Sequence, residues 1–379
     1  MHITNRNKFR ITRFIIFKGS LVLKLLARFK TPKKRLLIIK TDAIGDYVLF
    51  RNYLEIIKQS EKYKDFEIDL VGNSQWQELF LTFDKQFISK YWFIDENLLY
   101  NQPSVLLKLS KDLYSRSYQV IIQPTYSKTL MSNGLSALAA GKENISYRSF
   151  LEHHSRYKKK TDKFYTQLLD LPDTIYHELE KNFFFFKTVL ENDSLPFPSP
   201  ELPYNNSPKT GILIFAGSST LQRNWEKEKY LEIIHRLLKY TTYDIILAGG
   251  NSEIGVAEFF TNNISSQRLI NKVGKTKLSE LTELIAHSNL VISNETSAVH
   301  IAAACKTPVI CIQGGGHHER FTPYPDKALF KPTCVFEYLP CFNCNWNCRF
   351  VDNKDEIFPC ISKISIEHVW MTICQEINL

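Results

Sequence analysis

Two carboxylates and a glycine follow the first strongly apolar run of the chain. Residues 36–39 are typical of a buried strand that ends in Lys40, and the turn TDAIG, which contains Asp42, then leads into a helix predicted to open on Asp46. Ligands of parallel α/β sheets bind beyond the carboxyl ends of the strands. Both Asp42 and Asp46 therefore lie where a ligand is expected, and a carboxylate near a reacting hydroxyl group is suited to take its proton. The alternative interpretation is that Asp46 only caps the helix.

A second strand-to-helix junction, AGSSTLQRNWEKE at residues 216–228, is suited to phosphate. Gly217 permits a sharp turn, and Ser218 and Ser219 offer hydroxyl and backbone N–H groups. Arg223 adds a permanent charge on a planar fork that matches phosphate oxygens. Taken alone, the same residues also fit a capped helix start with a surface arginine.

Two further junctions carry polar side chains. In LAGGNSEIG, Glu253 lies just past a Gly-Gly pair, where a carboxylate can bind a ribose or complement a helix dipole. In ISNETSAVHIAAAC, Thr296 and Ser297 begin a predicted helix whose N–H groups can meet a phosphate. His300 lies one turn further along. A lone histidine is more often structural, but this one follows three polar residues at the end of a predicted strand.

Together the three later junctions predict a pocket for a nucleoside diphosphate. The chain contains no G-x-x-x-x-G-K-[ST] loop, which argues against an NTPase. It also contains no G-x-G-x-x-G after a strand, which argues against a dinucleotide oxidoreductase.

Strand-like and helix-like runs alternate on both sides of a proline-rich stretch at 192–210. The alternation predicts an α/β protein with two doubly wound, Rossmann-like domains, at 35–191 and 211–379, facing a cleft. The stretch between them is predicted to be a linker. Residues 146–192 are interpreted as longer helices.

The chain is basic, with 48 Lys and Arg against 39 Asp and Glu, and this favours anionic partners. Its amino-terminal segment, residues 1–34, is basic and amphipathic and contains no Asp or Glu. No apolar run approaches the roughly 20 residues that span a bilayer, and no secretory cleavage site is visible. We therefore expect a cytoplasmic protein whose amino-terminal segment lies on the anionic inner face of the plasma membrane. The alternative is a helix packed on the protein body with its charges solvated.

All eight cysteines fall in the last quarter of the chain. Four of them form a C-x2-C-x3-C-x11-C cluster at 341–360, which consists of Cys341, Cys344, Cys348 and Cys360. A local cluster in a reducing compartment favours a structural zinc site over disulfides. The spacing is irregular for a zinc ribbon, so free or redox-sensitive thiols in a packed loop are the alternative.

Five motifs in this order resemble glycosyltransferase family 9, the bacterial lipopolysaccharide heptosyltransferases. They are IIKTDAIGDYVLF, HELEKN, AGSSTLQRNW, AGGNSE and NETSAVHIAAACKTPVICIQG. The resemblance covers about residues 36–315. It implies the two-domain GT-B fold, an acceptor-binding first domain and a donor-binding second domain. It also implies a nucleotide-activated sugar such as ADP-heptose, inversion at the anomeric carbon, and no metal or other cofactor in catalysis.

The same resemblance assigns roles to individual residues of this chain. Asp46 occupies the position of the catalytic base, and Lys40 and Asp42 are expected to support the acceptor or the transition state. The donor is expected to contact Ser218, Ser219, Arg223, Glu253, Glu295, Thr296, Ser297 and His300. The chain departs from the family's D-T-G-x-x-H phosphate loop at two positions, where Glu295 stands for Asp and Ser297 for Gly. These changes add one methylene and one side chain to the pocket.

The sequence therefore predicts a glycosyltransferase that moves a heptose-like sugar to the lipopolysaccharide core or another cell-surface glycan. Its acceptor is expected to be anionic and carried on lipid, and no nucleic-acid partner is expected. Two alternatives remain open. One is a nucleic-acid-binding protein that uses the basic segment and a zinc-stabilised cysteine loop. The other is a GT-B nucleotide-sugar epimerase.

Overall fold

The computed structural model describes residues 3–149, 155–204, 209–353 and 355–379. The chain divides into two compact units. The first comprises Met1–Ile175 and Glu180–Pro196, and the second comprises Tyr176–Leu179 and Phe197–Leu379. The division thus falls inside the proline-rich stretch, and the four residues around the start of α10, Tyr176–Leu179, group with the second unit.

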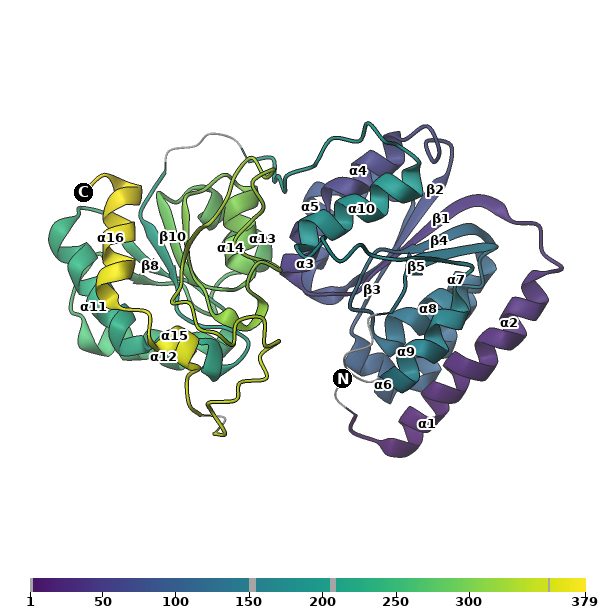
Figure 1. The fold of residues 1–379 in the computed structure, drawn as a ribbon, viewed down its shortest axis with the longest axis horizontal. Coiled ribbons are helices and arrows are strands. Elements are labelled where there is room, and N and C mark those ends of the chain that lie inside the picture. The colour runs from purple at the N-terminus through teal and green to yellow at the C-terminus, as the bar shows by residue number, and fades with distance from the viewer. Residues whose placement is uncertain (1–2, 150–154, 205–208, 354) are drawn as a thin grey trace. The chain divides into compact units, whose positions relative to one another are not determined.

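The first unit is a parallel sheet with helices on both faces (Figure 1). Its strands pair in the order β3-β2-β1-β4-β5-β6. The strands are β1 (Lys33–Lys40), β2 (Glu67–Asn73), β3 (Lys90–Ile94), β4 (Tyr118–Gln123), β5 (Glu143–Tyr147) and β6 (Gln167–Leu169). The helices are α1 (Arg6–Phe14), α2 (Ser20–Ala27), α3 (Ile44–Val48), α4 (Asn52–Gln59), α5 (Gln77–Phe83), α6 (Glu96–Asn101), α7 (Pro103–Ser115), α8 (Leu130–Ala139), α9 (Ser155–Thr161) and α10 (Glu178–Leu190).

The second unit repeats this plan, with strand order β12-β11-β10-β7-β8-β9, again all parallel. The strands are β7 (Ile212–Phe215), β8 (Ile245–Leu247), β9 (Leu269–Asn271), β10 (Leu290–Asn294), β11 (Val309–Ile312) and β12 (Thr333–Val335). The helices are α11 (Lys227–Tyr240), α12 (Ile254–Asn263), α13 (Leu278–Ala286), α14 (Ser297–Ala304), α15 (Pro359–Ser362) and α16 (Ile366–Ile377).

Both sheets therefore have the doubly wound order 3-2-1-4-5-6. In this order the chain reverses its direction of travel across the sheet between the first and fourth strands, and the crevice opened there is the usual ligand site. The reversal falls between β1 and β4 in the first unit and between β7 and β10 in the second.

Two local predictions are wrong. Residues 146–192 do not form longer helices throughout, because β5 runs to Tyr147 and β6 occupies Gln167–Leu169 before α10 begins. A three-residue edge strand carries too little of an alternating pattern to be recognised from sequence. The first short helix after β1 begins at Ile44 and not at Asp46, with Ala43 at its N-cap. Of the segment predicted to be helical, residues 150–154 lie outside the described residues.

The amino-terminal segment is part of the first unit's core. A π-helical turn at Ile15–Gly19 joins α1 to α2, and the resulting run packs along α8 (Figure 1). Ile16 is fully buried, and Gly134 on α8 makes room for it, since a Cβ at Gly134 would lie 2.8 Å from the Ile16 Cγ1. Within the described part of the chain, no helix is long and apolar enough to cross a bilayer.

Replacing Ile16 by alanine is expected to lower the free energy of unfolding by about 2–5 kcal/mol, because it leaves a cavity between the amino-terminal helix and α8. Ile11→Ala, on the exposed side of the same helix, is the matched control and is expected to change little. Urea denaturation of both variants measures the difference. Equal stabilities would mean that the segment is not part of the folded core.

Candidate functional site

The loop after β1 is held in place from several sides. Trp76 donates from its Nε1 to the Asp42 carbonyl oxygen at 3.0 Å, and Asn73 donates from Nδ2 to the Thr41 carbonyl oxygen at 3.0 Å. The Trp76 ring also stacks on Tyr47, with centroids 4.0 Å apart. Gly72 makes this possible, because a Cβ there would lie 2.2 Å from the Trp76 ring. The loop is therefore fixed before any ligand arrives.

Asp42 bridges the crevice between β1 and β4. Its Oδ2 accepts from Lys40 Nζ at 3.0 Å and from Thr125 Oγ1 at 2.8 Å. Its Oδ1 is buried and has no hydrogen-bond partner among the described residues. Asp46 is half-buried in the first turn of α3, two residues past Ile44. Because Ala43 is the N-cap, Asp46 is not the capping residue.

A polar cavity of about 290 Å³ lies beyond the carboxyl ends of β1, β2 and β3. Its lining includes Thr41, Asn73 and Glu96. The Glu96 Oε1 accepts from Thr41 Oγ1 at 2.6 Å and from Thr129 Oγ1 at 2.9 Å. Burial nevertheless raises the pKa of Glu96 above its usual value. Sequence reasoning missed this carboxylate, although it lies two residues past the end of β3, where α6 begins.

In the second unit, Asn294 joins the two strands of the crevice. At the end of β10, its Nδ2 donates to the Ala216 carbonyl oxygen at 2.9 Å, and its Oδ1 accepts from Trp225 N at 3.0 Å. The loop after β7 is thereby fastened to β10. Sequence reasoning named Glu295 and passed over Asn294, although this buried amide next to Glu295 is what holds the loop.

Arg223 lies in this crevice, and its guanidinium N–H groups are only partly used in hydrogen bonds. Its Nη1 donates to Ser219 Oγ and its Nη2 to the Glu295 carbonyl oxygen, both at a long 3.4 Å. Its Nε is buried without a hydrogen-bond partner among the described residues. The guanidinium carbon lies 4.2 Å from the Trp346 ring centroid, in cation–π geometry. Trp346 is a contact that sequence reasoning missed, since it comes from the distant cysteine cluster.

Two carboxylates beyond strand ends of this unit each have a buried oxygen without a partner among the described residues: Glu253 Oε2 and Glu295 Oε2. Burial raises the pKa of Glu295 to about 7, although the Arg223 charge and the Thr322 hydroxyl act in the opposite direction. Glu253 lies against Gly217, where a Cβ would approach the Glu253 Cγ to 2.1 Å. Together with Arg223 Nε, these two oxygens make three buried polar atoms without partners at the same end of the sheet. Unpaired buried polar atoms are costly, so the three point to a polar ligand.

The remaining predicted donor residues are at the same end of the sheet. Thr296 is the N-cap of α14 and accepts from Ala298 N at 3.3 Å, and Ser297 is the first residue of that helix. Ser218 Oγ donates to the Thr220 carbonyl oxygen at 2.8 Å. His300 is buried, and its Nδ1 is 2.8 Å from Tyr324 Oη.

The histidine carries no charge at neutral pH. Burial lowers the pKa of His300 to about 3, and His177 acts in the same direction. Arg223, unlike this histidine, is a cation that an anion in this crevice can meet. Its pKa is lowered by burial, but a guanidinium stays protonated.

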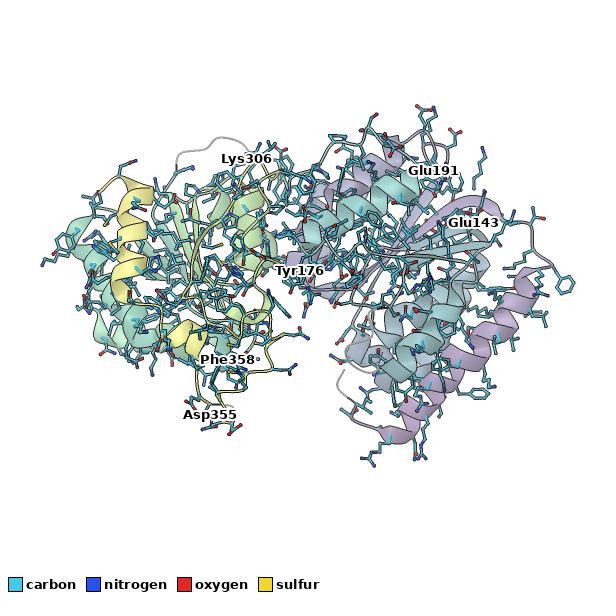
Figure 2. The ribbon with its side chains drawn as sticks, in the orientation of Figure 1. Glu143, Tyr176, Glu191, Lys306, Asp355 and Phe358 are labelled. Carbon is cyan, nitrogen blue, oxygen red and sulfur yellow. The ribbon has the colours of Figure 1, made fainter. Side chains whose placement is uncertain are left out.

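The four clustered cysteines line one small cavity of about 10 Å³, together with Gly315 and Trp346. All four are free thiols. Burial raises the pKa of the Cys360 thiol to about 11, and the neighbouring thiols act in the same direction. Phe358, labelled in Figure 2, stacks on Trp346 with ring centroids 5.6 Å apart. In the described ranges, no group of three or more His, Cys, Asp or Glu side chains is arranged to hold a metal ion. The zinc site stays a hypothesis.

Two doubly wound domains, each with polar groups at its strand reversal, are the architecture of GT-B proteins, and similar solved structures have the same fold. One is E. coli ADP-heptose lps heptosyltransferase II, at TM-score 0.68 and 14% identity over 91% of this chain and 98% of that chain. Another is E. coli heptosyltransferase WaaC with ADP-2-deoxy-2-fluoro heptose, at TM-score 0.64 and 17% identity over 90% of this chain and 99% of that chain.

The chain belongs to glycosyltransferase family 9 (heptosyltransferase), whose pattern it matches over residues 106–344. Among curated proteins it is similar to lipopolysaccharide heptosyltransferase 3 of Escherichia coli (strain K12), with 29% identity over 28% of this chain and 31% of the relative. The alignment thus spans about a third of that relative. The family match includes Arg223 and Glu295 and begins after Asp46.

Replacing Glu295 by glutamine is expected to flatten the pH dependence of stability. The unfolded glutamic acid loses its proton near its ordinary pKa of 4.5, and the folded one near 7, so the folded state binds more protons in between. Wild-type stability should therefore fall between these pH values relative to Glu295→Gln, by roughly 3 kcal/mol in total. Urea denaturation at stepped pH measures this. Parallel pH curves for the two proteins would contradict the burial of a titrating Glu295.

Proposed function

We propose that the protein is an inverting glycosyltransferase. It transfers a heptose-like sugar from a nucleoside diphosphate donor such as ADP-heptose to the lipopolysaccharide core or another cell-surface glycan. The observation that carries this proposal is the crevice between β7 and β10, where Arg223 and the two carboxylates keep unpartnered polar atoms. Family membership and the structure of WaaC with an ADP-heptose analogue support the choice of donor.

Each group in the crevice suits a part of such a donor. The Arg223 fork and the N–H groups at the start of α14 match a diphosphate, whose negative charge grows as it leaves. The unpaired oxygens of Glu253 and Glu295 can accept hydrogen bonds from ribose and sugar hydroxyls. A carboxyl group at Glu295 that is half-protonated near pH 7 also repels a diphosphate less than a fixed anion does.

The reaction needs a base for the acceptor hydroxyl. As the acceptor oxygen attacks the anomeric carbon, the bond to the diphosphate breaks on the opposite face and the hydroxyl proton passes to Asp46. Asp42 is assigned a different role, because its Oδ2 accepts from Lys40 and Thr125. Lys40 and Asp42 pair with each other and so hold the loop after β1 in position. No metal ion takes part in this scheme.

The acceptor is assigned to the first unit. The polar cavity beyond β1, β2 and β3 offers amide, hydroxyl and carboxyl groups of the kind that bind sugar hydroxyls. Because a lipid-linked acceptor is anchored in a membrane, we place the enzyme peripherally on the inner face of the plasma membrane. Any zinc at the cysteine cluster would serve structure only, and metal analysis of the purified protein tests whether it is present.

Asp46→Asn is expected to lower turnover by roughly 10²–10⁴-fold, the usual contribution of a positioned base, because an amide cannot take the acceptor's proton. Folding and ADP binding should be largely retained, because asparagine has almost the same size as aspartate and keeps a side-chain oxygen that accepts hydrogen bonds. Turnover is measured with saturating donor and acceptor, and nuclear magnetic resonance of the product reports the anomeric configuration.

Two variants in the same unit serve as controls. Asp42→Asn should be milder, because an amide oxygen still accepts from Lys40 and Thr125. Asp65→Asn, at an exposed position between α4 and β2, should be silent. Near-normal turnover of Asp46→Asn would remove the base assignment. Conversion of the donor sugar without an acceptor would instead indicate an epimerase.

A further inference from the structure

The helical run formed by α1, the π-helical turn and α2 has two apolar sides. One side is buried in the first unit: Ile15 and Ile16 are in its core, and Thr12 Oγ1 donates to the Tyr100 carbonyl oxygen at 3.3 Å. The other side exposes an apolar stripe whose members are related mainly by three, four or seven positions, which lie on one face of a helix. The stripe consists of Ile11, Phe14, Leu21, Val22, Leu25, Leu26 and Phe29. Phe29 and Phe14 are 85% and 66% exposed.

The charges around this stripe have one sign. The first acidic residue of the chain is Asp42, and twelve Lys or Arg residues precede it. Arg10, Lys18, Lys24 and Arg28 lie exposed along the same helical run. An exposed apolar face bordered by basic side chains complements the surface of an anionic bilayer.

A basic pocket of about 330 Å³ opens beside the stripe. Lys24, Arg28, Lys30 and Lys142 supply its cations, and Tyr114 and Gly141 contribute to its wall. Lys30 is already engaged, since its Nζ donates to the Tyr114 carbonyl oxygen at 2.9 Å. Among the described residues, the side chains of Lys24, Arg28 and Lys142 form no hydrogen bond or ion pair. The acidic neighbour is Glu143, labelled in Figure 2, which follows Lys142 but does not line the pocket.

We propose that the apolar stripe and the basic pocket form a docking surface for an anionic phospholipid bilayer. The stripe enters the boundary between headgroups and acyl chains, and the pocket binds the phosphate of one lipid. The inference rests on the proposed function in one respect: the docking surface would hold the enzyme where a lipid-linked acceptor lies. Nothing in the docking surface depends on which sugar is transferred.

The position of the pocket separates docking from chemistry. Pro32, Ser117 and Lys142 precede β1, β4 and β5, so the pocket lies at the amino ends of these strands. The loop that carries Asp46 lies at the carboxyl ends of the same parallel sheet. Substitutions in the docking surface should therefore leave the reaction on a water-soluble acceptor intact. Deleting the segment is a poor test, because it would also remove the buried Ile15 and Ile16.

The test is sedimentation of the full-length protein with phosphatidylcholine vesicles, made with or without phosphatidylglycerol. Wild-type protein should bind the anionic vesicles, bind the neutral ones weakly, and lose affinity as salt rises. Lys24→Glu/Arg28→Glu should weaken binding to anionic vesicles at least roughly tenfold. Leu25→Ser/Phe29→Ser should weaken it comparably by removing the inserted apolar groups.

Lys239→Glu/Lys272→Glu, two exposed lysines of the second unit, is the matched control with the same change in net charge. It should bind vesicles like wild type. Equal binding by the pocket variant and wild type, or equal loss in the control, would overturn the proposal. Strong binding of wild type to DNA or RNA with none to anionic vesicles would also overturn it. Retained ADP binding in that case would leave the proposed function standing.

Discussion

The constraint on which the structure depends is that both sheets are parallel and covered on both faces. Leu37, Ile39, Ile214 and Ile292 are all fully or almost fully buried, so the strands themselves have no place for a polar group that must meet a ligand. Polar side chains can gather where the strands end. The shared order 3-2-1-4-5-6 then concentrates them at the reversal in each sheet.

Desolvation sets the chemical character of the second unit's crevice. It raises the pKa of Glu295 and lowers that of His300, whereas Arg223 keeps its charge for an anion bound there. The stacking of Arg223 on Trp346 links this crevice to the cysteine cluster. The thiol loop is thus a support for the arginine, whether or not it holds a metal ion.

Sequence patterns predicted the parts of the fold that carry strong periodicity. The strand at residues 67–73 and the helix that begins with Ser297 lie where they were expected, because long apolar runs and small-residue helices leave clear signals. The motifs also predicted that Arg223 and Glu295 line one pocket, and in the structure Arg223 donates to the Glu295 carbonyl oxygen. The contacts between distant segments were not predictable, since no local pattern encodes that Trp346 stacks on Arg223 or that Ile16 fits against Gly134. The start of α3 was misplaced because Ala43 caps it without a side-chain signal.

The most direct test of the account is calorimetry of ADP binding to wild-type protein, Arg223→Ala and, as a control, the exposed Arg349→Ala. Hydrogen bonds to charged groups contribute roughly 1.5–3 kcal/mol, so Arg223→Ala should bind ADP about ten- to a hundredfold more weakly. Arg349→Ala should bind ADP like wild type. Equal affinity of Arg223→Ala and wild type, or no binding of any nucleoside diphosphate by wild type, would contradict the assignment of the crevice between β7 and β10 as the donor site.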